Sequence, residues 1–186
     1  MTTSANVSAA KPKVGGAISY APIGTAVPTD AVSTLNEAFK SLGYISEDGF
    51  KNNFSISSNK VKAWGGDVVL VTQTDSSDEC SFTLIEGTNP DVLGVVYGEN
   101  NVSGDLANGI TVNVNAEQHE DFVWVVDMVL RNGALKRIVL PCAAISSVEE
   151  IAYNDTSAIG YAIKLTATAD SSGNTHYEYI KGKGAE

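Results

Sequence analysis

The stretch Phe122–Leu130 reads FVWVVDMVL, and it is followed by Asn132-Gly133 and then by Ala134–Leu140, ALKRIVL. Nearly every position of the first stretch is apolar, which is typical of a β-strand with both faces covered. Asn-Gly between two apolar runs is the strongest short signal for a β-hairpin, because both residues tolerate positive φ. We therefore predict two antiparallel strands joined by a tight turn at this point.

Alternation of apolar with polar residues predicts strands over most of the remaining chain. They are Val14–Tyr20, the residues from Phe54 to Ala63, Val68–Thr74, the run from Cys80 to Ile85, Tyr161–Ala167 and Thr175–Lys181. Polar hairpin turns are expected at Asp75–Glu79 and at 171–174. Roughly seven to nine strands without an internal repeat predict a mainly β fold, an antiparallel β-sandwich or barrel.

Two segments have helical features. Asn89 is a good N-cap, Pro90 suits the first helical position, and Gly98 fits a C-terminal stop, so a short flanking helix is predicted between them. In Asp30–Leu42 the apolar residues lie near helical spacing, and a capping-box pair precedes Gly43. We predict a short helix or helical turn there.

The length of 186 residues and the 43 % hydrophobic content fit one globular domain. Residues 1–13 are polar and predict an N-terminal arm, ordered by a neighbouring molecule, ahead of a single domain over 14–186. Cys80 and Cys142 lie in apolar runs and are expected to be buried free thiols. No apolar run approaches the roughly 20 residues of a membrane helix or resembles a signal peptide, so we expect synthesis in a cytoplasm and no membrane partner.

The formal net charge of −10 argues against a protein that grips nucleic acid, because phosphate binding requires clustered Lys and Arg. It is compatible with a protein that stands beside DNA without binding it, since an acidic wall would let DNA slide past. Plain solubility explains the same charge. The composition alone leaves these two explanations open.

The sequence offers no set of residues for catalysis, so we expect no enzyme, no metal and no cofactor. His119 lies in an acidic stretch without zinc-ligand spacing, and His176 alternates with tyrosines as if it decorated one strand face. The acidic stretch Asp75–Glu79 lacks the central Gly of a calcium loop. Glu149 and Glu150 are adjacent, so in a strand they would point to opposite faces.

Lys60–Asp67, KVKAWGGD, interrupts a pair of predicted strands with a Trp in a Gly-rich loop. An exposed Trp in such a loop suits a protein interface, because aromatic residues are enriched in interface cores. The alternative is that Trp64 caps the core of the domain.

Several stretches resemble the tail tube protein family of siphophages that infect Gram-positive bacteria. They are Lys62–Val69 (KAWGGDVV), Ser81–Glu86 (SFTLIE) with Asn89–Leu93 (NPDVL) and Tyr97-Gly98, and earlier Gly24-Thr25, Pro28–Asp30 and Leu42–Gly49 (LGYISEDG). The resemblance covers roughly residues 14–100, and the order of the motifs is its specific part.

This resemblance implies hexameric rings whose inner strands form one continuous barrel around a lumen, and rings that stack into a tube. A long loop and the terminal arms would bridge successive rings, and DNA would pass through an acidic bore during ejection. The implied partners are further copies of the chain and the tail tip or baseplate, tape measure and terminator proteins. The protein would be a virion component.

Residues are assigned to these roles as expectations. Candidates for contacts between rings are Lys11, Lys13, Lys60, Lys62, Trp64, Gly65 and Gly66; candidates for the lumen are Asp67, Asp75, Glu86 and Asp127. Two other functions stay open. One is the tube of a contractile-tail-like or secretion apparatus, and the other is a carbohydrate- or host-binding β-sandwich, for which only Tyr177 and Tyr179 provide grouped aromatics.

Overall fold

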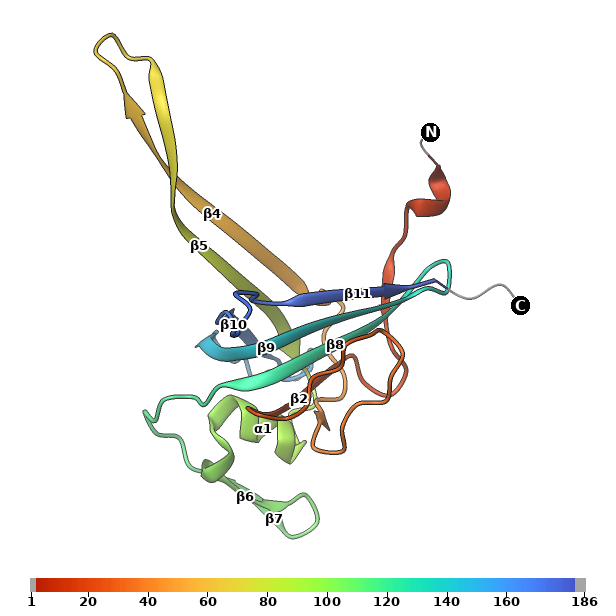
Figure 1. Cartoon of the computed structure of the whole chain (residues 1–186). Coiled ribbons are helices and arrows are strands. Elements are labelled where there is room, and N and C mark those ends of the chain that lie inside the picture. Colours follow the sequence, from red (N-terminus) through yellow and green to blue (C-terminus); the bar gives the residue numbers. More distant parts are fainter. Residues whose placement is uncertain (1–2, 183–186) are drawn as a thin grey trace.

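A computed structural model describes residues 3–182, and a nine-stranded antiparallel sheet dominates it (Figure 1). Its strands are β1 (Ala10–Pro12), β2 (Ile18–Pro22), β3 (Lys40–Ser41), β4 (Lys51–Lys62), β5 (Val68–Leu84), β8 (Phe122–Leu130), β9 (Leu135–Val148), β10 (Tyr161–Ala167) and β11 (Tyr177–Lys181). Their order is β3-β2-β8-β9-β10-β5-β4, with β1 also paired to β8 and β11 to β9. A separate two-stranded sheet contains β6 (Val102–Asp105) and β7 (Gly109–Val112).

The large sheet curls until its two ends meet. β3 pairs with β2, and directly after β3 the amide of Leu42 donates to the carbonyl of Ile18 at 2.9 Å. The chain then reaches β5, where Ile45 forms a bridge with Leu84. The segment after β3 therefore joins β2 to β5 and closes a barrel, one of the two mainly β architectures predicted from the sequence.

The predicted hairpin at the centre of the sequence is confirmed. β8 and β9 pair from Val129–Leu135 to Phe122–Ala143, and Gly133 has the positive φ that the turn requires. Residues 122–127 of β8 are all buried, which agrees with a strand covered on both faces. Trp124 is fully buried, and its indole Nε1 donates to the carbonyl of Ala143 at 3.0 Å, so its polar atom is satisfied inside the core.

The predicted flanking helix is also confirmed, as α1 (Pro90–Tyr97). The side chain of Asn89 accepts a hydrogen bond from the amide of Asp91, and Gly98 follows with positive φ. Two helical turns are too short to be stable alone. The helix is held because its buried face, Val92, Leu93, Val95 and Val96, belongs to the main core. Two single 3₁₀ turns, Ser4–Asn6 and Glu99–Asn101, complete the helical elements of the described residues.

The helix expected over Asp30–Leu42 is wrong. The side chain of Asp30 accepts hydrogen bonds from the amides of Val32 and Ser33, and that of Asn36 from the amide of Ala38. Such local bonds stabilise turns in competition with a helix. The carbonyls of Asp30 and Ser33 are then bound by Arg137 of β9 at 3.1 and 3.0 Å, so a tertiary contact fixes this loop.

The turn expected at Asp75–Glu79 is also wrong, because these residues lie inside the 17-residue strand β5. Their partners on β4 continue without interruption, from Ser57 opposite Asp75 to Asn53 opposite Glu79. A register shift between Ser57 and Ser58 accommodates the extra residue on β5. The polar composition reflects the exposure of Asp75 and Ser76 to solvent and the buried hydrogen bonds of Asp78, and not a reversal of the chain.

The expected N-terminal arm is partly built into the sheet by its own chain. β1 pairs with β8 from Ala10–Leu130 to Pro12–Met128, so no neighbouring molecule is required to order residues 10–12. Val14 is almost wholly exposed, and the strand expected from it begins only at Ile18. Residues 1–2 of the expected arm and 183–186 of the expected domain lie outside the described residues.

Cys80 is buried, as expected, whereas Cys142 is only half-buried, and both are free thiols. No helix among residues 3–182 is both long and apolar enough to cross a membrane.

Candidate assembly surfaces

The protruding hairpin, defined as residues 54–77 of β4, β5 and their connection, extends away from the barrel (Figure 1). β10 pairs with β5 only from Glu79 onward, so beyond that point β4 and β5 pair only with each other in the described chain. At about 3.4 Å per residue, Val68 to Ser77 alone spans roughly 30 Å. The protruding hairpin is therefore a long two-stranded ribbon that no other described element covers.

Large apolar side chains are exposed along this ribbon. They are Phe54, Ile56, Val61, Trp64, Val68, Val69, Leu70 and Val71. Val61 lies opposite Leu70, and Lys60 lies opposite Val71. Because successive residues of a strand point to opposite faces, the two pairs place apolar side chains on both faces of the ribbon.

Trp64 lies at the tip of the protruding hairpin. The tip is closed by a hydrogen bond from the amide of Ala63 to the carbonyl of Asp67, 2.8 Å, and both Gly65 and Gly66 have positive φ. The Trp64 side chain is fully exposed. The alternative that Trp64 caps the domain core is therefore wrong, and the tip presents an uncovered indole.

Asp78 anchors the base of the protruding hairpin. Its side chain is fully buried and accepts hydrogen bonds from Asn52 of β4, 2.7 Å, and from Thr175, 2.6 Å; it also contacts Nδ1 of His176. Burial alone raises the pKa of Asp78, but these partners outweigh it and hold the pKa below its usual value. His176 therefore does more than decorate a strand face, because it helps tie the hairpin to the chain before β11.

The remaining candidates for ring contacts lie elsewhere. Lys11 is exposed on β1, and Lys13 just after β1 is 3.4 Å from the carboxylate of Asp127. Lys60 and Lys62 are exposed near the end of β4. The structure thus divides the candidates between β1 and the protruding hairpin, which Figure 1 shows at separate places on the molecule.

The acidic candidates for the lumen have different surroundings. Asp67 and Asp75 are exposed on the protruding hairpin. Glu86 accepts hydrogen bonds from the amide of Tyr44 and from Asn89. Asp127 is buried and paired with Arg137, so it offers no free charge to a channel, and we withdraw it as a lumen candidate.

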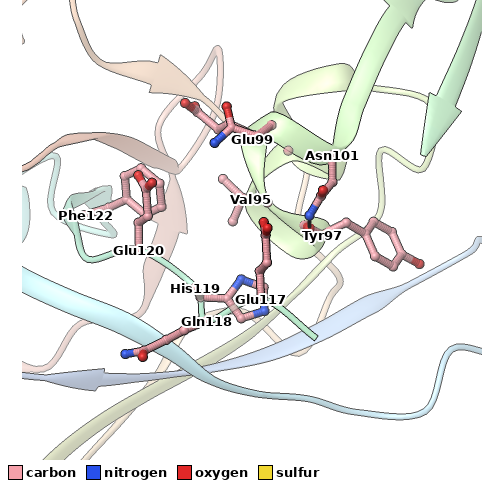
Figure 2. A pocket seen from close by; sticks show the side chains of 12 residues that line it. Val95, Tyr97, Glu99, Asn101, Glu117, Gln118, His119, Glu120 and Phe122 are labelled. Carbon is pink, nitrogen blue, oxygen red and sulfur yellow. Dashed lines mark hydrogen bonds between the residues drawn. The ribbon is translucent and has the colours of Figure 1, made fainter. Parts of the chain in front are cut away.

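A small pocket beside α1 is lined by acidic and amide side chains and one histidine. It has a volume of about 150 Å³ and is bordered by residues 94–101 and by residues 117–122, including Glu117, His119 and Glu120 (Figure 2). His119 is the pocket's only histidine, and no Ser, Cys or Lys lines it to serve as a nucleophile. Among residues 3–182, no three His, Cys, Asp or Glu side chains gather as they would around a metal ion.

The aromatic pair considered for carbohydrate binding does form. The rings of Tyr177 and Tyr179 stack on each other with centroids 6.2 Å apart. Both side chains are half-buried. The pair therefore offers a single small platform on β11.

A comparison with models of protein families identifies the family of this chain. The model of a phage tail tube protein family matches residues 4–184, nearly the whole chain. The chain belongs to the phage tail tube protein family. A search of curated proteins finds no match.

As a phage tail tube protein, the chain is a structural subunit of the virion that assembles with other tail proteins. The family match confirms the resemblance seen in the motifs and extends it well beyond residues 14–100. The narrower assignment to siphophages of Gram-positive bacteria stays a prediction. The exposed apolar ribbon now has an obvious context, because a tube subunit must present surfaces to its neighbours.

Proposed function

We propose that this chain forms hexameric rings which stack into the tail tube, and that the protruding hairpin carries contacts between subunits. The observation that carries the proposal is the exposed apolar surface of the hairpin in the single chain. A lone two-stranded hairpin is at best marginally stable in water. Large exposed apolar patches mark interaction sites. A second subunit that covers the ribbon would stabilise the hairpin and bury its apolar side chains.

Open strand edges support ring formation. In the described chain β4 pairs only with β5, and β11 only with β9. Such edges are templates for pairing with another chain, and a closed ring of subunits leaves none exposed. We therefore propose that edge strands of adjacent subunits pair around the ring and form the wall of the lumen.

The bore is proposed to be negatively charged. The chain has a net charge of −10, and Asp67 and Asp75 are exposed on the protruding hairpin, which extends furthest from the barrel. DNA carries one charge per about 1.7 Å of its axis, so a basic wall would bind it and stall its passage. Repulsion between like charges keeps the duplex centred over a Debye length of roughly 8 Å.

Electron microscopy of the purified protein, with tail initiator proteins added, tests the proposal. Six-fold rings and tubes are the expected result, and the electrostatic potential over their inner surface should be negative. A protein that stays monomeric at high concentration with initiator present would contradict assembly. A neutral or positive bore would refute the role of the charge and leave solubility as its explanation.

A further inference from the structure

An apolar groove that has no role in the proposed function lies beside α1. We call it the α1–β7 groove, and its volume is about 550 Å³. Leu93 and Tyr97 of α1, Ile110 and Val112 of β7, and Ile159 and Tyr161 before and within β10 line it. At its border Leu106, Val114 and Tyr153 are each more than two-thirds exposed.

The groove and the protruding hairpin lie at opposite ends of the molecule. In Figure 1 the hairpin projects from one end of the barrel, and α1, β6 and β7 form the other end. When copies are arranged head to tail, the hairpin of one copy points toward the groove of the next. A contact between two different surfaces of the same chain generates rings or filaments, which a self-complementary contact does not.

The charges of the two surfaces are complementary. The tip of the protruding hairpin, Lys60–Asp67, has two lysines, Lys60 and Lys62, and one acid, Asp67, so the tip is positively charged on balance. From Glu86 to Leu130 the chain has several Asp and Glu residues and no Lys or Arg. Lys40 pairs with Asp91 and Glu99 on the other side of α1, so those two acids are compensated.

Two acids that are close in sequence to the border residues Leu106 and Tyr153 are not paired with a cation in this way. Asp105 directly precedes Leu106, and hydrogen bonds from Asn108 hold its pKa below the usual value, so it is ionised at neutral pH. Asp155 lies two residues after Tyr153 and is exposed. Neither Asp105 nor Asp155 takes part in an ion pair among the described residues.

From these observations we infer that the α1–β7 groove receives the tip of the protruding hairpin of a second copy of this chain. Trp64 and an aliphatic side chain on one face of the Val68–Val71 run enter the groove, and Lys60 and Lys62 face its acidic border. The volume lies within the roughly 300–1,000 Å³ of clefts that bury drug-sized ligands, so it accommodates an indole with a neighbouring aliphatic side chain. The inference rests on the proposed assembly and names the surface that the hairpin binds.

Site-directed disulfide formation in assembled tubes tests this contact. Ala63→Cys lies beside Trp64 at the tip, and Ala107→Cys lies beside Leu106 at the groove, and both positions are exposed. All variants carry Cys142→Ser to remove the half-buried native thiol, whereas Cys80 is buried. The matched control combines Ala63→Cys with Ala26→Cys, an exposed alanine in the loop after β2.

Mild oxidation of the Ala63→Cys/Ala107→Cys tubes should shift the monomer band to a ladder of dimers and larger species on a denaturing gel. The control pair and each single variant should stay monomeric. Tubes of normal appearance without the ladder, or with an equal ladder from the control, would overturn the inference and leave the proposed function intact. If the wild-type chain forms neither rings nor tubes, the proposed function itself fails.

A second variant tests the groove without engineered thiols. Leu106→Lys changes a side chain that is 69 % exposed, so the monomer should unfold at the wild-type temperature. The inference predicts that rings no longer stack. The control Ile23→Lys, also at an exposed apolar position, should stack normally. Normal tubes from Leu106→Lys would contradict the inference.

Discussion

Asp127 of β8 and Arg137 of β9 are directly opposite each other, and both carboxylate oxygens of Asp127 are held by the guanidinium, Nε–Oδ1 at 2.6 Å and Nη2–Oδ2 at 3.0 Å. Arg137 is fully buried. Its remaining nitrogen, Nη1, binds the carbonyls of Asp30 and Ser33. One buried side chain thus ties the central hairpin to the long loop between β2 and β3.

Replacing Asp127 by Ala should therefore be strongly destabilising, because it leaves the buried Arg137 without its counter-ion. Removing one partner of a buried ion pair costs about 3–5 kcal/mol. Urea unfolding followed by fluorescence measures the loss. Lys13→Ala is the control, since Lys13 contacts the same carboxylate from a half-exposed position and exposed pairs contribute about 0–1 kcal/mol. Equal effects of the two variants would contradict the central role of Arg137.

Asp78 should make folding stability depend on pH in the acidic range. Its pKa in the folded protein is lower than the ordinary value of 3.8, so the folded state favours the ionised form. This contribution is fully present above the unfolded pKa and is lost as the pH falls through the folded pKa.

We therefore expect the unfolding temperature of the wild type, measured between pH 6 and pH 2, to fall more steeply below about pH 4 than the unfolding temperature of Asp78→Asn. Asp30 and Asp170, whose pKa values are also lowered, contribute equally to both proteins. Parallel profiles for the two proteins would refute the role of Asp78.

Asn89→Ala should weaken the start of α1 by about 1 kcal/mol, the usual effect of losing an N-cap. The side chain also donates to Glu86 at 2.9 Å, so the turn before the helix loses a bond as well. Thr88→Ala, at the exposed neighbouring position, is the control and should change little. Chemical denaturation measures the free energies of unfolding of the two variants and of the wild type.

Trp64→Ala should leave the monomer as stable as the wild type, because the indole is fully exposed, and yet it should block tube growth. Circular dichroism on heating and negative-stain microscopy measure the two properties. Normal tubes from this variant would remove Trp64 from the assembly contacts.

The expected role of the N-terminal arm is tested by a deletion that leaves β1 in place. Removal of residues 1–12 would delete β1, and so expose the edge of β8 in the monomer itself. Removal of residues 1–7 keeps β1 and the bond from the amide of Arg131 to the Ser8 hydroxyl. If the arm contacts other subunits, the shorter deletion should prevent stacking without changing monomer stability, and normal tubes would show that it does not.

Reversing the charge of the hairpin tip with Lys60→Glu and Lys62→Glu should weaken stacking at low salt. The Debye length falls from about 10 Å at 0.1 M to about 3 Å at 1 M salt, so the difference from wild type should shrink as salt is added. Light scattering across a salt series measures the extent of stacking of the variant and of the wild type. Lys164→Glu, at a partly exposed lysine of β10 on the barrel, is the control.

Local patterns predicted the elements that depend on local physics. Asn89, Pro90 and Gly98 define the bounds of α1, and Asn132-Gly133 defines the central turn, because capping and positive φ are properties of a few neighbouring residues. A loop at the hairpin tip was also indicated locally, since Gly65-Gly66 interrupts two strand-like runs, whereas the exposure of Trp64 was left open. The buried roles of Asp78 and Asp127 were missed, because their partners are distant in the sequence.

The sequence by itself determined that this protein is a mainly β tail tube subunit with one short helix. It could do so because strand alternation, turn residues and the order of the family motifs are all present in the linear chain. Only the tertiary structure decided that Asp75–Glu79 continues a strand, that Asp30–Leu42 is a loop, and that the barrel closes through Ile45 and Leu84. Each of these depends on hydrogen bonds between residues far apart in the sequence, and such bonds form only when the fold brings their partners together.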